Sequence, residues 1–517
     1  MSSPGHDPKK QVLEDSSPHY PPSLENNLQQ AMELHEKGEL EQAAALYSHV
    51  LAQRPENLIA RCNLGIIQHS RGNLPAAIEQ YLDVLDRDAG NFMAMSSLAC
   101  ACADIGNFED AITYYRRSLG IEPEHAGIHF RLGLIYYQEK QATNAVVCFE
   151  LAIKYDPGHF QSWYNLGVIH QEKGRFESAI NCYRQALRLE SDDSDGLYNL
   201  AVVLAETARY EEAAVHFTQA LQLEPDNAKI CNSLGAVYKN LNIIDRAEYY
   251  FTKAVTIRPD YAEALKNLGV ISNIKGDRTA AAEYFRRVIA LGHDVEAARF
   301  MLSALTGERR ESAPEDYVRT LFDSYADRFD EDLTVNLRYR APRQLREMIR
   351  EIAPDIEFSE LLDLGCGTGL SGEAFADLHG KLTGVDISDE MLRRAAEKKI
   401  YTQLYCREII DYLENTSDEF DLVVAADVLI YIGRLDSFFQ ALARCCRSGA
   451  MLAFSTEFCP DEEDFQLRRS GRYAHSTSYI NRMAAGHGFE IIARRSEKLR
   501  KEKGEWIQGT LFLLRRV

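Results

Sequence analysis

The sequence predicts two parts of different fold class: an all-α array of eight helical repeats, followed by an α/β domain built on a mostly parallel sheet. The first part is predicted from a pattern of small and aromatic residues that recurs every 34 residues. The second is predicted from apolar runs of strand length that alternate with stretches of helix length. A chain of 517 residues is long enough for about two to four domains, so each part can bury a core of its own.

The repeats keep one register without insertion through Val295. The twentieth residue of every copy is alanine, from Ala43 to Ala281, and the twenty-fourth is aromatic, from Tyr47 to Phe285. Small residues allow the two antiparallel helices of a copy to approach closely, and we expect the aromatic ring to fill the gap against the next copy. The copies begin at Leu24, Leu58, Phe92, Ala126, Phe160, Ser194, Ala228 and Ala262.

This register resembles that of the tetratricopeptide repeat over residues 24–295. The resemblance implies a right-handed superhelix whose concave groove holds a peptide or a protein surface. The sixth position, which should face the groove, is asparagine in four copies: Asn63, Asn165, Asn199 and Asn267. A side-chain amide is both donor and acceptor, so these residues could bind the backbone of an extended peptide. They could equally bond to the neighbouring copy, and the sequence leaves both roles open.

The second part is organised around a glycine-rich turn that follows the apolar run beginning at Leu361. Gly365, Gly367 and Gly369 follow one another at every second position, which lets the backbone turn tightly and approach a ligand closely. Asp363 stands two residues before the first glycine. A carboxylate there would repel a pyrophosphate, so we expect a ligand that carries a cation near the turn.

A second carboxylate, Asp386, ends the next predicted strand and lies 23 residues after Asp363. Carboxylates at about this offset accept hydrogen bonds from ribose hydroxyls in doubly wound domains. The alternative is that Asp386 caps the predicted helix Asp389–Glu397. The glycine turn and this acidic residue together predict a nucleoside-binding pocket.

The DxGxGxG string resembles the first motif of class I S-adenosylmethionine (SAM)-dependent methyltransferases. Over the whole chain the similarity is to bacterial methyltransferases that carry tetratricopeptide repeats. The resemblance implies SAM as cofactor and a Rossmann-like sheet of seven strands in the order 3-2-1-4-5-7-6. It also implies that Asp386 and Ile387 bind the cofactor. Glu408 (or Asp411) would meet the adenine amino group, and Asp427 would lie at the methyl end of the cofactor.

Other candidate residues depend on the identity of the acceptor. If the acceptor is a hydroxyl or a carboxyl, Tyr431 and His475 are the candidate catalytic bases. The fourth strand lacks the (D/N)PP(Y/F) sequence of methyltransferases that act on nucleobase amines. In the predicted helix Pro314–Asp330, the aromatic pair Tyr325 and Phe329 either covers the cofactor or belongs to an ordinary packing face. No spacing of His or Cys predicts a metal site.

Composition restricts the partners and the compartment. The net charge of −20 disfavours nucleic acid and anionic membranes as partners. No run of 18 apolar residues predicts a membrane span. Eleven cysteines without a regular framework indicate reduced thiols and a cytoplasmic protein. We expect a disordered lead over 1–23 that is no secretory signal, repeats over 24–295, a capping helix and linker over 296–313, and the methyltransferase domain over 314–517.

Three functions follow from these parts. In the first, the groove recruits a protein or a peptide, which the second domain methylates. In the second, the acceptor is a small molecule and the repeats only dock the enzyme onto an assembly. In the third, the chain is a scaffold whose SAM fold is inactive; the intact Asp363, Asp386 and glycine turn argue against this last reading.

Overall fold

The computed structural model describes residues 22–354, 356–378, 380–502 and 505–517. The chain divides into two compact units, Met1–Ser191 and Asp192–Val517, and each unit is described by itself. Residues 1–21 of the predicted lead lie outside the described residues. The first described helix begins at Pro22, within the last two residues of that predicted segment. Within the described ranges, no helix has both the length and the hydropathy that crossing a bilayer requires.

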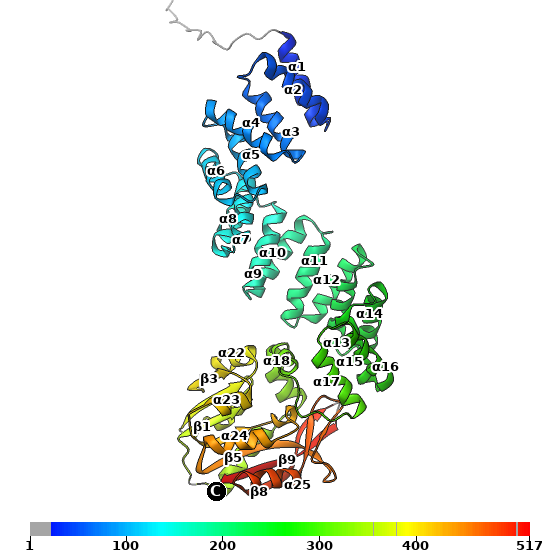
Figure 1. The fold of residues 1–517 in the computed structure, drawn as a ribbon, viewed down its shortest axis with the longest axis vertical. Coiled ribbons are helices and arrows are strands. Elements are labelled where there is room, and N and C mark those ends of the chain that lie inside the picture. Colours follow the sequence, from blue (N-terminus) through cyan, green and yellow to red (C-terminus); the bar gives the residue numbers. More distant parts are fainter. Residues whose placement is uncertain (1–21, 355, 379, 503–504) are drawn as a thin grey trace, which may run out of the picture. The chain divides into compact units, whose positions relative to one another are not determined.

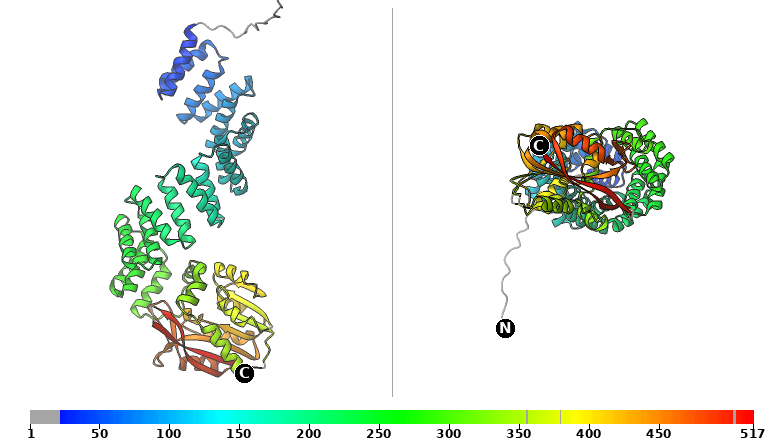
Figure 2. Two further views of the ribbon diagram at one scale, coloured as in Figure 1. Left: turned by 180° about the vertical axis from the view of Figure 1, so that it is seen from behind. Right: turned by 90° about the horizontal axis from the view of Figure 1, so that it is seen from below.

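The first unit consists of helices that pack in successive pairs, coloured blue to cyan in Figures 1 and 2. Their bounds are α1(Pro22–Glu36), α2(Leu40–Gln53), α3(Leu58–Ser70), α4(Leu74–Arg87), α5(Phe92–Asp104), α6(Phe108–Ile121), α7(Ala126–Gln138), α8(Ala142–Tyr155), α9(Phe160–Glu172) and α10(Phe176–Leu189).

The helix starts agree with the predicted register. Leu58 and Phe92, two predicted copy starts, are the first residues of α3 and α5. Asn57 and Asn91 stand directly before them, and each side chain accepts an N–H from the first turn of its helix. This capping satisfies a backbone donor that the helix itself cannot pair.

The repeated aromatic residue packs on the glycine of its own repeat. An ideal Cβ on Gly65 would lie 2.7 Å from the ring of Tyr81, and one on Gly133 would lie 2.5 Å from the ring of Phe149. That the ring also fills the gap against the next copy stays a prediction. The ring needs the space that a missing side chain leaves, so the two positions stabilise one helix pair.

The second unit begins with further helices of the same register and continues into the α/β domain. The helices are α11(Ser194–Glu206), α12(Tyr210–Leu223), α13(Ala228–Asn240), α14(Ile244–Ile257), α15(Ala262–Lys275), α16(Arg278–Ala290) and α17(Val295–Thr306). Phe300 of α17 is fully buried. Its ring centroid lies 5.2 Å from that of Tyr317 and 6.2 Å from that of Tyr473. Helix α17 thus joins the repeats to the core of the α/β domain.

The α/β domain contains one sheet with the strand order β3-β2-β1-β4-β5-β9-β8. Strands β1 to β5 pair in parallel, and β9 pairs antiparallel with both β5 and β8. This is the predicted order of seven strands. Two short strands that we had not predicted, β6 and β7, pair with each other, and β7 also pairs in parallel with the carboxyl end of β5. The bounds are β1(Glu360–Leu364), β2(Lys381–Asp386), β3(Gln403–Cys406), β4(Phe420–Ala425), β5(Cys446–Cys459), β6(Phe465–Leu467), β7(Tyr473–Ser476), β8(Phe489–Glu502) and β9(Glu505–Arg516).

Helices cover both faces of this sheet because neighbouring strand residues point to opposite sides. Leu362 and Val423 belong to a core with α23, α24 and α25, whereas Leu361 and Leu422 belong to a core with α20 and α21. The helical elements are α18(Glu315–Asp323), η1(Ala326–Arg328), α19(Phe329–Glu331), η2(Asp332–Asn336), α20(Ala341–Ile352), α21(Leu370–Phe375), α22(Asp389–Glu397), α23(Ile409–Asn415), η3(Leu429–Tyr431), α24(Asp436–Cys445) and α25(Thr477–Gly486).

Candidate active site

A cavity of about 600 Å³ lies at the carboxyl ends of β1, β2 and β4. Its walls are the glycine turn (Gly365–Gly369), the residues that follow β2 and β4, and the covering segment, which we define as residues 315–336. Ligands of doubly wound sheets bind at this edge, so the cavity is where the topology places a site.

The glycine turn needs its glycines for two reasons. Gly365, Gly367 and Gly369 have φ values of 63°, 54° and 92°. Residues that carry a side chain rarely adopt this backbone conformation. A Cβ on Gly365 would also lie 2.3 Å from Cγ2 of Val428, which follows β4. The backbone of the turn therefore faces the cavity without side chains and packs closely on the end of β4.

Asp386 lies where the sequence predicted a ribose contact. Its Oδ2 accepts the N–H of Gly367 at 2.8 Å, and its Oδ1 accepts the N–H of Ser388 at 2.9 Å. Burial raises the pKa of Asp386 to about 6, although the backbone N–H donors oppose this effect. Helix α22 is capped by Ser388, whose Oγ accepts the N–H of Met391, so the capping role that we considered for Asp386 belongs to Ser388.

Asp363 does not line the cavity. It is 2% exposed beneath the glycine turn, where Oδ2 accepts a hydrogen bond from the hydroxyl of Tyr401 at 2.7 Å and Oδ1 has no hydrogen-bond partner among the described residues. Burial raises the pKa of Asp363 to about 7, and the nearby Asp386 adds to the increase. Gly369 also lies outside the lining, with its Cβ position 3.2 Å from the ring of Tyr401. The sequence analysis missed Tyr401, whose hydroxyl binds Asp363 and whose ring packs against Gly369.

Of the two candidates after β3, Glu408 lines the cavity and Asp411 does not. Glu408 is the N-cap of α23, and its Oε2 accepts the N–H of Asp411 at 2.8 Å. Burial raises the pKa of Glu408. Ile387, Gly365, Gly367 and Asp427 line the same cavity, so most of the predicted cofactor residues meet there.

The covering segment is attached to the loops around the cavity by ion pairs and hydrogen bonds. Asp323 accepts the hydroxyl of Ser388 at 2.6 Å. Asp330 accepts the hydroxyl of Thr368, and Lys398 approaches it to 2.9 Å. The predicted pair Tyr325 and Phe329 lines the cavity, with ring centroids 5.7 Å apart. The segment is held against both the glycine turn and the loop after β2.

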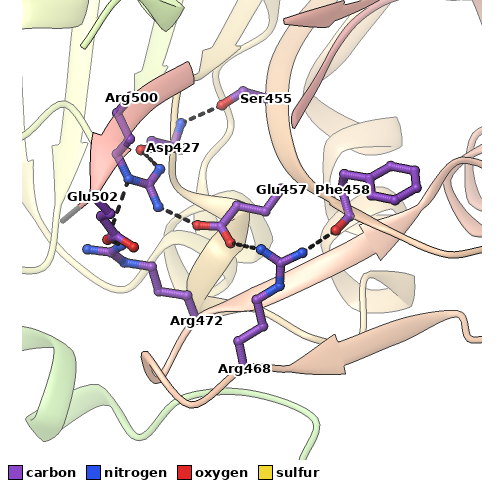
Figure 3. Close-up of polar contacts among 8 residues, drawn as sticks. All are labelled: Asp427, Ser455, Glu457, Phe458, Arg468, Arg472, Arg500 and Glu502. Carbon is purple, nitrogen blue, oxygen red and sulfur yellow. Dashed lines mark hydrogen bonds and ion pairs between the residues drawn. The ribbon is translucent and has the colours of Figure 1, made fainter. Parts of the chain in front are cut away.

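Part of the cavity wall belongs to a network of charged side chains (Figure 3). Arg500 of β8 pairs with Asp427 and with Glu457 of β5, and Glu457 also pairs with Arg468 at 2.8 Å. Arg500 is 3% exposed; burial opposes its charge, but Asp427 and Glu457 outweigh this and raise its pKa. Arg472, which lines the cavity, pairs with Glu502.

The sequence analysis found only Asp427 in this network. The signal that could have revealed the rest is a charged residue inside an apolar strand, as at Glu457 in β5. A buried charge of this kind needs a partner of opposite charge. The sequence does not say which arginine supplies it.

The two candidate bases lie in different surroundings. Tyr431 lines the cavity, and its ring packs against the edge of Phe322. His475 is 2% exposed in β7, and its Nε2 donates to the carbonyl oxygens of Ile432 (2.9 Å) and Gly433 (3.1 Å). Burial lowers the pKa of His475 to about 4. His475 does not line the cavity, so we no longer propose it as a base.

The predicted groove asparagines make local contacts. The amide of Asn267 donates to Oδ1 of Asn232 in the preceding repeat at 3.2 Å, which is one of the two roles that the sequence left open. Asn165 donates to the carbonyl of Gln161 in its own helix. The roles of Asn63 and Asn199 stay predictions.

One group of possible metal ligands occurs among the described residues: His69, Cys100 and Asp104. His69 already bonds to Asp104 at 2.7 Å, and the guanidinium of Arg131 lies 3.2 Å from the sulfur of Cys100. A neighbouring cation opposes the binding of a metal ion, and we propose no metal site here.

Three family models match the chain. A tetratricopeptide-repeat model matches residues 28–92, the model of the C-terminal domain of cilia and flagella-associated protein 70 matches residues 91–305, and a methyltransferase-domain model matches residues 362–452. The solved structure of YrrB, a TPR protein with an unusual peptide-binding site, is 20% identical over 36% of this chain and 95% of that chain, with a TM-score of 0.34. This score is too low to support any further conclusion.

Curated relatives match the second domain. The ubiquinone biosynthesis O-methyltransferase of Shewanella halifaxensis is 31% identical over 116 residues, which is 21% of this chain and 48% of the relative. The mitochondrial enzyme of the same description from Homo sapiens is 29% identical over 104 residues, 19% of this chain and 28% of the relative. The chain spans less than half the length of these curated relatives. With the strand order and the repeats, these matches identify the chain as a tetratricopeptide-repeat protein with a C-terminal class I methyltransferase domain.

Proposed function

We propose that the protein is a SAM-dependent methyltransferase. The observation that carries the proposal is Asp386, a buried carboxylate that faces the cavity at the end of β2 and is bonded to the bare backbone of the glycine turn. A ribose diol can donate to this carboxylate, and the backbone of Gly365 and Gly367 lines the same cavity. We propose that Glu408, which follows β3 and lines the cavity, accepts a hydrogen bond from the adenine amino group.

The charges around the cavity support SAM over a dinucleotide. The arginines that line it, Arg472 and Arg500, are both already paired with carboxylates. A pyrophosphate would therefore meet Asp386 and Glu408 without a free cation among the described lining residues. A cofactor with an ammonium group and a sulfonium suits this surface.

The cofactor would supply an electrophilic methyl group, and the residues of the chain bind and orient the reactants. Holding nucleophile and methyl group in line provides most of the catalysis that such a displacement needs. The covering segment, attached through Asp323 and Asp330, would exclude water from the cavity. The relatives that match this domain are O-methyltransferases by their descriptions, and we propose an oxygen atom as the acceptor.

For the repeats we propose recruitment of a protein or a peptide, which is either the acceptor or the assembly on which the enzyme docks. The match to tetratricopeptide-repeat models supports this role. Methyl-labelled SAM, added with the full chain to a cell lysate, separates the two cases by the size of the labelled product. Label on a protein band supports a protein acceptor, and label only in the small-molecule fraction supports docking.

Calorimetry with SAM tests the proposed enzyme against an inactive scaffold. The full chain is expected to bind SAM, and Asp386→Asn is expected to weaken binding about 100-fold, because a charge-assisted hydrogen bond to the ribose is lost. Asp389→Asn is the matched control, since Asp389 is exposed at the start of α22 and lies outside the cavity lining. Failure of the unmodified chain to bind SAM would favour the scaffold.

The affinity for SAM is expected to fall as the pH is lowered from 8 to 5. Because burial raises the pKa of Asp386 to about 6 in the folded protein, this carboxyl takes up a proton well above the pH at which an exposed one would. The protonated form is a poorer acceptor, so we expect a loss of about tenfold per pH unit below 6. Between about pH 4 and pH 6 the same proton uptake makes the ligand-free fold more stable. Calorimetry over this range tests the prediction, and an affinity independent of pH would contradict it.

A further inference from the structure

The covering segment contacts the repeat helices as well as the loops around the cavity. The guanidinium carbon of Arg328, in η1, lies 5.4 Å from the ring centroid of Tyr210. Tyr210 is the first residue of α12, which belongs to the same compact unit as the α/β domain. A cation at this distance is attracted by the charge distribution of an aromatic ring. The segment that covers the cavity is therefore attached to the repeats.

The same arginine links the repeats to the cavity wall. Its guanidinium carbon lies 5.6 Å from the ring centroid of Tyr325, which lines the cavity. Tyr325 packs on Phe329, and a Cβ on Gly367 of the glycine turn would lie 3.4 Å from the ring of Phe329. A continuous series of contacts thus connects Tyr210 in the repeats with the glycine turn.

The covering segment has few apolar contacts that would keep it closed. None of the described residues of α18, α19 and η2 is buried. Toward the cavity the segment is held by polar contacts, through Asp323 and Asp330. Segments with few buried apolar contacts open locally without unfolding of the core. The covering segment can therefore open while the sheet stays folded.

The two ends of the covering segment are held differently. Near its beginning, Tyr317 packs on Phe300 of α17, and both Tyr317 and Val318 pack against the core of the α/β domain. Further along, the contact with the repeats is made by the charged side chain of Arg328. An opening motion would therefore pivot near α18 and separate Arg328 from Tyr210.

A neighbouring lysine weakens the contact between Arg328 and Tyr210. Burial lowers the pKa of Lys239 in α13, and the nearby charges of Lys266 and Arg328 lower it further. The positive charge of Lys239 repels Arg328 and offsets part of the attraction by the ring. A contact with these opposing contributions holds the segment and still allows it to separate.

We propose that the repeats control access to the cavity through this contact: Arg328 on Tyr210 holds the covering segment closed, and loss of the contact speeds its opening. This inference rests on the proposed function, because the molecule retained in the cavity would be SAM or the demethylated cofactor. Tyr210 and Arg328 are positioning residues, since neither lines the cavity.

Hydrogen exchange of the full chain without SAM tests whether the contact holds the segment. Tyr210→Leu removes the aromatic ring but keeps an apolar side chain, so α12 is expected to fold. Exchange over residues 315–336 follows the opening equilibrium of the segment. It is expected to be about two- to fivefold faster in the variant, which corresponds to the loss of one exposed cation–π contact.

Tyr249→Leu is the matched control for this measurement. Tyr249 lies in α14 and is 62% exposed, with its ring packed on the adjacent Tyr250. The control is expected to leave exchange over residues 315–336 unchanged. Equal exchange in Tyr210→Leu and the unmodified chain would overturn the proposal.

The rate of SAM release tests whether the contact controls access. The full chain is loaded with labelled SAM and chased with an excess of unlabelled SAM. Because release waits for the covering segment to open, Tyr210→Leu is expected to release the label faster by the same factor as in hydrogen exchange. Faster exchange with unchanged release would show that the contact does not control access, and the proposal would be wrong.

A double variant tests whether the two residues act together. Arg328→Met is expected to speed release less than Tyr210→Leu, because it also removes the repulsion by Lys239. The variant that carries both changes is expected to be no faster than Tyr210→Leu, since one contact can be lost only once. A faster double variant would overturn the proposal. If the unmodified chain fails to bind SAM, the proposed function itself fails; if it binds SAM and the variants release it normally, only the present inference fails.

Discussion

Replacing Gly365 with alanine is expected to abolish measurable SAM binding and to lower the free energy of unfolding by about 2–4 kcal/mol. Two costs add in this variant. The φ of 63° is unfavourable for alanine, at about 1 kcal/mol. The new Cβ would also lie 2.3 Å from Cγ2 of Val428, so the glycine turn or the end of β4 must shift, at about 1–3 kcal/mol. Both segments form the wall of the cavity, so the shift also displaces the residues that would hold the cofactor.

Gly449→Ala separates the two costs. Gly449 has a similar positive φ of 84°, but its Cβ position has no heavy atom within 4 Å. This control is expected to lose only about 1 kcal/mol and to bind SAM normally. Denaturant unfolding gives both free energies, and calorimetry gives both affinities. If Gly365→Ala behaved like Gly449→Ala, the close packing of the glycine turn on Val428 would be wrong.

Replacing Arg500 with methionine is expected to lower the free energy of unfolding by about 3–5 kcal/mol. Arg500 is the partner that neutralises the buried carboxylate of Asp427, and it also pairs with Glu457. Glu457 would keep its ion pair with Arg468. Asp427 would lose its ion pair, and its carboxylate would be left unpaired with only 14% of the side chain exposed. Methionine fills much of the same volume, so the loss reports the unpaired charge more than a cavity.

Arg515→Met is the matched control on the neighbouring strand. Arg515 of β9 pairs with Glu490 at 2.8 Å, with about half of each side chain exposed. Exposed pairs of this kind contribute about 0–1 kcal/mol, and the control is expected to stay within that range. Denaturant unfolding of both variants measures the difference. Similar losses in the two would show that the Arg500 network is not effectively buried.

Features with a local or periodic pattern were predictable from the sequence. The spacing of 34 residues gave helix starts such as Leu58 and Phe92, because an uninterrupted repeat fixes its own register. The glycine turn and Asp386 were predictable for a related reason. A strand, a glycine turn and a carboxylate at the end of the next strand can each be recognised from a few consecutive residues.

Predictions failed where the role of a residue depends on distant segments. His475 reads as a polar loop residue, yet β7 buries it against the carbonyl oxygens that follow η3, 42 and 43 residues earlier in the chain. The extra strand pair β6 and β7 escaped notice because such short strands carry too little pattern. Asp363 has the expected position in the sequence, but Tyr401, 38 residues later, binds it beneath the glycine turn and away from the cavity.

The sequence by itself determined the two fold classes, the repeat register, and the glycine turn and Asp386 that line the cavity. Only the tertiary structure decided the charge network, in which Arg500 pairs with Asp427 and Glu457, which lie 73 and 43 residues earlier in the chain. The physical reason is that a buried charge requires a partner but does not specify which one. That choice follows from the order in which the sheet places β4, β5 and β8, and no short stretch of sequence contains it.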